Sequence, residues 1–231
     1  MVLGLKKQKR RLLKIKKLST HRVLSTINTV LLKMIMQNKV RENLLQIQED
    51  IAPYKPNIIA VTKYFDEGAI ISAYNAGMRD FAESRAVEAT EKINNLPEEI
   101  RKNSKFHFIG HLQSNKVKKV VSNFDYIHSV DSLKLAQAID EEASKKGIVQ
   151  KVLLQVNNAG EEQKFGFSVE ELKEVFPKLL NLKSVKIEGL MNIAPLYADS
   201  EKLRALFKNI KQIYDELQYE FKLELKQISM G

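Results

Sequence analysis

The stretch of residues 56–77, PNIIAVTKYFDEGAIISAYNAG, decides the fold because a short connection joins an apolar run to an amphipathic one. Residues 57–62 are mostly apolar and β-branched, which is typical of a buried strand. Residues 66–77 open with two acids and close with Gly77, which predicts a helix with its usual start and stop signals. The stretch therefore predicts a strand–helix unit, with Lys63 at the carboxyl end of the strand.

The same alternation continues along the chain, between short connections and without hairpin signals. An amphipathic helix is expected first, over residues 37–52. Further strands are expected over residues 78–82, 106–110, 125–130, 150–157, 185–191 and 223–231. Further helices are expected over 84–96, 114–124 with Ser114 as N-cap, 131–147 capped by Asp131 or Ser132, 168–182 and 200–221. Strict alternation predicts parallel strands with crossover helices. Seven strands fit either a doubly wound sheet or a (β/α)8 TIM-type barrel that lacks its last strand and helix.

Composition excludes several classes of protein. The chain has 231 residues, enough for one sizeable core, and it contains no cysteine. Disulfides, thiolate metal sites and cysteine nucleophiles are therefore excluded. No G-x-G-x-x-G or P-loop sequence occurs, so dinucleotide and triphosphate sites have no support.

The net charge of +10 lies entirely at the N-terminus. Residues 1–35 hold ten of the 38 basic residues and no acid, which leaves 28 basic and 28 acidic residues in the remainder. A charge confined in this way describes a tail rather than a domain. We expect residues 1–35 to be a disordered or helical extension outside the core, and residues 36–231 to form the barrel, incomplete at its C-terminus.

Three interpretations of this tail remain open on sequence grounds. It could be an upstream extension with Met36 opening the true chain, which we favour because Met36 directly precedes the first well-patterned helix. It could be a basic amphipathic segment that binds membranes or nucleic acid. It could be a transit peptide, although such peptides favour arginine over the lysine found here.

Functional residues in parallel α/β folds lie at the carboxyl ends of strands. Those ends carry Lys63, Glu83, Ser84, Gly110, His111, His128, Ser129, Asn157, Asn158, Met191, Asn192, Ser229 and Gly231. This set contains no paired-carboxylate centre, no Ser-His-Asp arrangement and no credible metal site. A zinc site at His107 and His111 would lack a third ligand, so a histidine hydrogen-bonded beside the barrel mouth is the better interpretation of His107.

Two interpretations of Lys63 stand side by side when spacing alone is considered. A lysine after a strand is usually solvated, and with an ordinary pKa of about 10.4 it is a poor nucleophile. Partial burial at a strand end lowers the pKa of an amine and frees it to form a Schiff base with an aldehyde or ketone.

Six segments carry a resemblance that favours the second interpretation. They are IIAVTK (58–63), FAESRAVEATEKI (81–93), FHFIGHLQSNK (106–116), LLQVNNAGEEQKFGF (153–167), EGLMNIAPL (188–196) and ISMG (228–231). In these segments, which keep the family order, the chain resembles the pyridoxal phosphate homeostasis protein family. That family shares its fold with the N-terminal barrel of alanine racemase.

The resemblance implies a (β/α)8 TIM-type barrel that binds pyridoxal 5′-phosphate (PLP) as an imine of Lys63. It places the cofactor ring near Ser84, His107 and Met191, and the phosphate at a glycine-rich stretch that opens with Ser229 and Gly231. Backbone amides in such a stretch favour an anion. The implied function is to hold PLP for intracellular PLP homeostasis, without a defined catalytic reaction.

Two departures from the family pattern affect the expected site. The family usually reads F-G-E-N where this chain has FAES (81–84), so Ser84 replaces a longer side chain. The chain also stops at Gly231, where the family continues through the phosphate loop and an eighth strand. We therefore expect exposed sheet edges and weak or absent retention of the cofactor.

Two alternatives come from other classes of function. A PLP-dependent amino-acid racemase would need a second acid–base group on the opposite face of the cofactor. A nucleic-acid-binding module would rely on the basic tail and would bind in a salt-sensitive way, but the neutral body argues against it. We expect a monomeric cytoplasmic carrier that binds PLP and passes it to apo PLP-dependent enzymes, with no nucleic-acid or membrane partner.

Overall fold

The computed structural model describes residues 37–160, 165–195 and 197–230. The expected extension over residues 1–35 and the candidate Gly231 lie outside the described residues. The chain divides into two compact units. The first, which runs to Asn57 and also takes in Gly68–Met78, contains a helix through residues 37–50 and most of α2 (Glu67–Asn75).

The second unit contains every strand of the described chain. The strands are β1 (Ala60–Val61), β2 (Asp80–Glu83), β3 (Lys105–Phe108), β4 (Tyr126–Val130), β5 (Gln150–Gln155), β6 (Val185–Asn192) and β7 (Gln227–Met230). They pair in sequence order, and every pair is parallel. Because parallel strands share one direction, all of their carboxyl ends lie at the same edge of the sheet.

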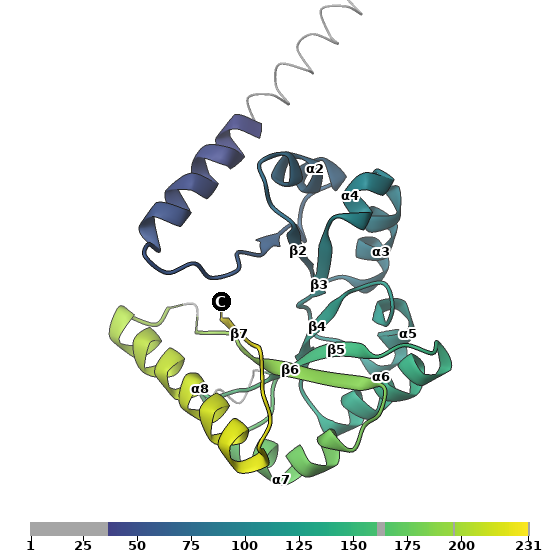
Figure 1. The fold of residues 1–231 in the computed structure, drawn as a ribbon, viewed down its shortest axis with the longest axis vertical. Helices are drawn as coiled ribbons and strands as arrows, with labels where there is room; N and C mark the ends of the chain where they lie inside the picture. Colours follow the sequence, from purple (N-terminus) through teal and green to yellow (C-terminus); the bar gives the residue numbers. More distant parts are fainter. Residues whose placement is uncertain (1–36, 161–164, 196, 231) are drawn as a thin grey trace, which may run out of the picture. The chain divides into compact units, whose positions relative to one another are not determined.

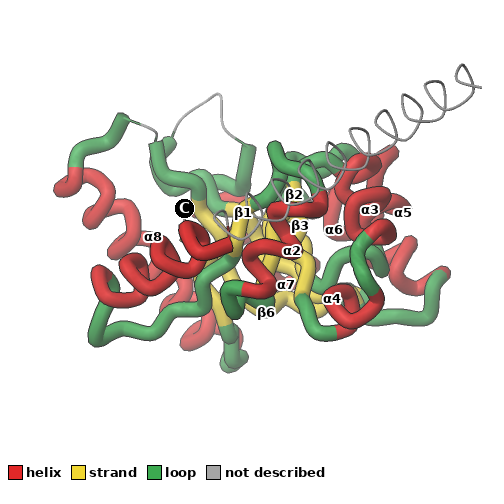
Figure 2. The backbone as a smooth tube through the Cα atoms, turned by 90° about the horizontal axis from the view of Figure 1, so that it is seen from above, coloured by secondary structure: helices red, strands yellow, loops and turns green. Residues whose placement is uncertain are grey.

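The α-helices of this unit lie along the outer side of the curled strands (Figure 1). They are α3 (Ala86–Asn95), α4 (Glu98–Lys102), α5 (Val117–Val120), α6 (Leu133–Lys145), α7 (Val169–Leu180) and α8 (Ser200–Phe221). Figure 2 shows the strands flanked by α8 on one side and by α3 and α5 on the other. Fully buried apolar side chains from strands and helices, such as Phe81, Ile127 and Phe176, form the core. No helix in the described part of the chain has the length and apolar character needed to span a bilayer.

The sheet is strongly curled. His128 of β4 and Ser229 of β7 form a hydrogen bond of 3.0 Å, although β5 and β6 lie between their strands. Neighbouring strands are about 4.8 Å apart, so a flat sheet would separate β4 from β7 by roughly 14 Å. The curl brings both side chains to the concave face. The predicted TIM-type α/β fold without its last strand is confirmed as a curled, seven-stranded half-barrel, and no ladder joins β1 to β7 among the described residues.

Three local predictions differ from the structure. The expected strand over residues 57–62 shrinks to β1, because only Ala60 and Val61 have partners on β2. The expected helix over 114–124 is a 3-10 turn (Ser114–Lys116) followed by α5, and Ser114 makes no capping hydrogen bond. The short α4 was missed because it buries a single side chain, Ile100, and so shows no periodicity.

Candidate functional site

Thr62, the residue before Lys63, takes part in four hydrogen bonds, in one of which its carbonyl accepts from the backbone N–H of Phe65 at 3.0 Å. Its backbone N–H donates to the carbonyl of Ala82 (3.0 Å), and its hydroxyl donates to Glu83 Oε1 (2.7 Å). Its own carbonyl accepts from Lys92 Nζ at 2.9 Å. The backbone at the carboxyl end of β1 is therefore fixed on both sides.

Glu83 and Lys92 form the buried ion pair behind Thr62. Their side chains are 2% and 12% exposed, and Lys92 Nζ lies 2.6 Å from Glu83 Oε1. Lys63 itself lies in the turn that follows β1, which the Phe65-to-Thr62 hydrogen bond closes. Lys63 is half-buried there, with its Nζ 5.1 Å from the centre of the Tyr64 ring.

Ser84 follows β2 and lies against the end of β3. A Cβ atom built on Gly110 would collide with the carbonyl oxygen of Ser84 and lie 2.8 Å from its Cα. Only a glycine at residue 110 permits this approach. Ser84 also lines an open pocket of about 620 Å³, together with Phe108, His111 and Lys116 among others.

His107 does not lie at the mouth of the barrel but within it. Its ring is fully buried and both nitrogens are engaged: Nε2 lies 3.0 Å from Asp80 Oδ1, and Nδ1 lies 2.9 Å from Nε2 of His128. His128 Nδ1 in turn contacts the hydroxyl of Ser229. Any role of His107 toward a ligand would therefore be exerted through this chain of side chains.

Burial lowers the pKa of both histidines. For His107 the desolvation outweighs the hydrogen bond and the charge of Asp80, which act in the opposite direction. For His128 burial and the neighbouring His107 lower the pKa to about 3. Both imidazoles are therefore neutral near pH 7.

The ends of β6 and β7 bring Met191 and Ser229 together. The two residues are register partners, and Met191 is buried whereas Ser229 is half-buried. The next residue of β6, Asn192, is 2% exposed, and its Oδ1 has no hydrogen-bond partner among the described residues. A buried acceptor without a donor is unfavourable, so this atom marks a place where a ligand or water donor fits.

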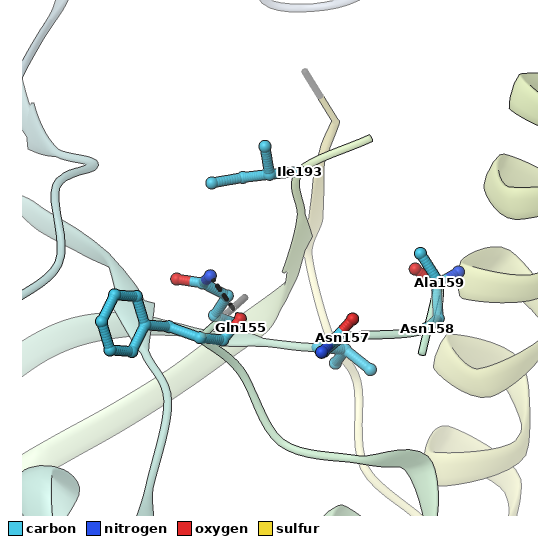
Figure 3. A pocket seen from close by; sticks show the side chains of 7 residues that line it. Gln155, Asn157, Asn158, Ala159 and Ile193 are labelled. Carbon is cyan, nitrogen blue, oxygen red and sulfur yellow. Dashed lines mark hydrogen bonds between the residues drawn. The ribbon is translucent and has the colours of Figure 1, made fainter. Parts of the chain in front are cut away.

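A small pocket of about 160 Å³ adjoins the ends of β5 and β6. Figure 3 shows Ile193 above Gln155, with Asn157 and Asn158 following β5. The amide of Gln155 donates to the carbonyl of Phe165 at 2.8 Å, which holds the returning loop against the strand end. The Phe165 ring stacks on His111, with centroids 3.6 Å apart.

Of the predicted site residues, the structure links His107 to Ser229 through His128 and pairs Ser229 with Met191. Lys63 and Ser84 lie at the ends of the neighbouring strands β1 and β2. Sequence reasoning missed Asp80, although an acid inside the predicted strand of residues 78–82 was a usable signal. Within the described ranges, no group of acidic or histidine side chains could hold a metal ion.

Comparison with known proteins identifies the family. A family model described as alanine racemase, N-terminal domain, matches residues 35–231. The pyridoxal phosphate homeostasis protein of Synechocystis is 42% identical over 185 residues, which are 79% of this chain and 84% of that protein. The chain belongs to the pyridoxal phosphate homeostasis protein family. The pyridoxal phosphate homeostasis protein of Aquifex aeolicus is 38% identical over 75% of both chains.

Solved structures agree with this family assignment. PipY of Synechococcus elongatus, solved with PLP bound, is 36% identical with a TM-score of 0.72, over 83% of this chain and 88% of that chain. The structure of PipY without PLP gives a TM-score of 0.74. An alanine racemase from Clostridium difficile shares the fold, with a TM-score of 0.66 and 18% identity over half of its length. The resemblance drawn from the sequence motifs is therefore confirmed.

The residues at this edge of the sheet fit the cofactor of the family. Lys63 supplies a half-buried amine, and Ser84 and Ser229 supply hydroxyl groups. An aldehyde, a phenol and a phosphate need groups of these kinds.

Proposed function

We propose that this chain binds PLP through the amine of Lys63 and takes part in the homeostasis of that cofactor. The observation that carries the proposal is the position of Lys63, half-buried directly after a strand end, where the preceding residue is fixed by four hydrogen bonds. The bound cofactor would supply a reactive aldehyde. The chain would supply the amine and the polar groups of Ser84 and Ser229.

The names of the relatives support a binding role rather than a catalytic one. They are called homeostasis proteins after the cofactor, and the PipY structure holds that cofactor. We further propose that apo PLP-dependent enzymes receive the cofactor from this chain. Loaded protein should then restore the activity of an apo enzyme, and a dialysis membrane between the two would show whether direct contact is needed.

Reductive trapping tests the binding proposal. PLP added to the chain should give visible absorbance of a lysine-linked cofactor, and borohydride followed by peptide mass spectrometry should place the label on Lys63. Lys63→Ala should lose both signals, while Lys102→Ala, at a side chain that is 72% exposed, should keep them. Labelling spread over surface lysines, or unchanged in Lys63→Ala, would refute the proposal.

A racemase remains the second candidate because the matching family model is named after alanine racemase. We expect no exchange of the Cα proton of L-alanine in deuterated buffer with loaded protein. Exchange that disappears in Lys63→Ala would favour the racemase.

A further inference from the structure

Four side chains form a continuous hydrogen-bonded chain across the concave face of the barrel, here called the relay. It runs from Asp80 of β2 through His107 of β3 and His128 of β4 to Ser229 of β7. Its three links measure 3.0, 2.9 and 3.0 Å. Asp80, His107 and His128 are buried, and only Ser229 is half-exposed at the mouth.

The carboxylate at one end fixes the direction of every link. A carboxylate accepts but cannot donate, so Nε2 of His107 carries a hydrogen and its Nδ1, in a neutral ring, must accept. His128 therefore donates from Nε2, and its bare Nδ1 accepts the hydroxyl hydrogen of Ser229. The lowered pKa values of both histidines are consistent with neutral rings.

This direction opposes the binding of an anion at Ser229. The hydroxyl hydrogen points inward to His128, so the oxygen presents only lone pairs to the mouth. A phosphate dianion also carries only acceptors and needs a donor. The hydroxyl can turn to the phosphate only if His128 Nδ1 gains a hydrogen of its own.

We propose that a phosphate bound at Ser229 reverses the relay with the uptake of one proton, which comes to rest on His107 beside Asp80. This inference rests on the proposed function, since it takes the phosphate of the cofactor to contact Ser229.

The proton balance closes without any further reactant. A proton from solvent or from the phosphate monoanion enters at the Ser229 oxygen, and Ser229 passes its own hydrogen to His128 Nδ1. His128 then passes its Nε2 hydrogen to His107 Nδ1. Afterwards His107 holds hydrogens on both nitrogens, His128 donates from Nδ1, and Ser229 donates to the phosphate.

The surroundings explain why the charge rests on His107 rather than on His128. His107 contacts the Asp80 carboxylate, whereas the hydrogen-bond partners of His128 among the described residues are a histidine and a serine. The ring of Tyr126 stacks on His107 at 4.9 Å, which also favours a cation. Further charged groups near the relay are Asp125, which favours the charge on His107, and Lys105, which opposes it. Three further charged groups surround Tyr126: Lys151 Nζ lies 5.2 Å from the centre of its ring, and Glu188, which accepts from its hydroxyl, pairs with Lys186.

The first experiment uses the free protein and needs no variant. Long-range proton–nitrogen NMR distinguishes the two tautomers of neutral histidine. We expect both His107 and His128 to carry hydrogen on Nε2 at pH 7.5. Hydrogen on Nδ1 of either ring would overturn the resting direction, whether or not the chain binds PLP.

The second experiment measures proton uptake with pyridoxine 5′-phosphate, which has the ring and phosphate of PLP but no aldehyde to react with Lys63. Calorimetry in buffers of different ionisation enthalpy, between pH 7 and 9, should show uptake approaching about one proton per ligand. The affinity for pyridoxine 5′-phosphate should fall by up to about tenfold for each unit by which the pH rises. The phosphate is already a dianion between pH 7 and 9, so the relay accounts for this dependence.

Two variants separate the relay from other titrating groups. Asp80→Asn keeps an acceptor for His107 but removes the negative charge, and Ser229→Ala removes the contact with the phosphate. Both variants should lose the proton uptake and should bind pyridoxine 5′-phosphate with an affinity that depends little on pH. Equal uptake in wild type and Ser229→Ala would overturn the inference while leaving the proposed function intact. If neither pyridoxine 5′-phosphate nor PLP bound to the chain, that result would instead count against the proposed function.

Discussion

At the residue scale, Thr62 explains how Lys63 is held in place. All three polar groups of Thr62 are engaged, and two of its partners, Glu83 and Lys92, form a buried ion pair. Removing one member of such a pair leaves the other charge buried without compensation, which is more costly than the loss of a surface pair.

Lys92→Met should therefore lower the free energy of unfolding by about 3 kcal/mol. The matched control is Lys102→Met, because Lys102 also lies 2.6 Å from its partner, Glu98, but both side chains are more than two-thirds exposed. The control should lose less than about 1 kcal/mol. Urea unfolding measures both, and equal losses would show that the buried pair does not support Thr62.

The buried histidines predict how stability depends on pH. The pKa of His128 is about 3 in the folded chain and 6.5 in the unfolded chain. Between these two pH values the unfolded state therefore binds a proton on this residue and the folded state does not. Stability is complete above pH 6.5 and is lost as the pH falls toward 3. The slope from this residue approaches about 1.4 kcal/mol per pH unit.

Urea unfolding at pH 6 and pH 5 checks this expectation, because most carboxylates remain ionised over that interval. The free energy of unfolding of His128→Gln should depend less on pH than that of the wild type, by the equivalent of about one bound proton. The variant should nevertheless be less stable at pH 7. An unchanged slope would mean that His128 is protonated in the folded chain.

At the element scale, the pairing of β6 with β7 positions Ser229. Gly189 opposes Gln227 in this ladder, and a Cβ atom on Gly189 would collide with the Gln227 carbonyl oxygen and lie 2.7 Å from its carbonyl carbon. Glycine at this position lets β7 approach closely enough for Ser229 to reach His128.

Gly189→Ala should displace β7, lower the free energy of unfolding by about 1–3 kcal/mol and weaken the binding of PLP. The control is Gly147→Ala, where φ is +65° but a Cβ atom would meet nothing within 4 Å. It should cost about 1–2 kcal/mol through backbone strain and leave binding unchanged. Equal binding by both variants would show that the position of β7 does not matter for the ligand.

At the scale of the whole molecule, charge is divided unevenly along the chain. All of the net charge of +10 belongs to residues 1–35, and the family model matches from residue 35 onward. These residues lie outside the described structure, so their separation from the barrel remains a prediction.

A chain that begins at Met36 should keep its free energy of unfolding within about 0.5 kcal/mol and bind PLP as the full chain does. We expect no retention of the full chain on DNA; salt-sensitive retention that vanishes with residues 1–35 removed would instead favour a nucleic-acid-binding tail. Thermal unfolding and DNA-column elution at two salt concentrations test both expectations. A large loss of stability would place the segment in the core.

The sequence by itself determined the order of the elements, the parallel sheet and the strand ends that carry Lys63, Ser84 and Ser229. These features follow from local periodicity, capping signals and motifs, all of which depend on residues that are close together in the sequence. The bounds of α8, Ser200–Phe221, coincide with the predicted helix over residues 200–221 because its apolar repeat is long and regular.

Only the tertiary structure decided which of these residues act together. His128 and Ser229 are 101 positions apart in the sequence, and Asp80 joins them through His107 because the sheet curls. Curvature depends on the packing of all strands and helices at once, so no local pattern reveals it. The sequence therefore predicted Lys63 as the amine of the site, whereas the fold determined the relay that ends at Ser229.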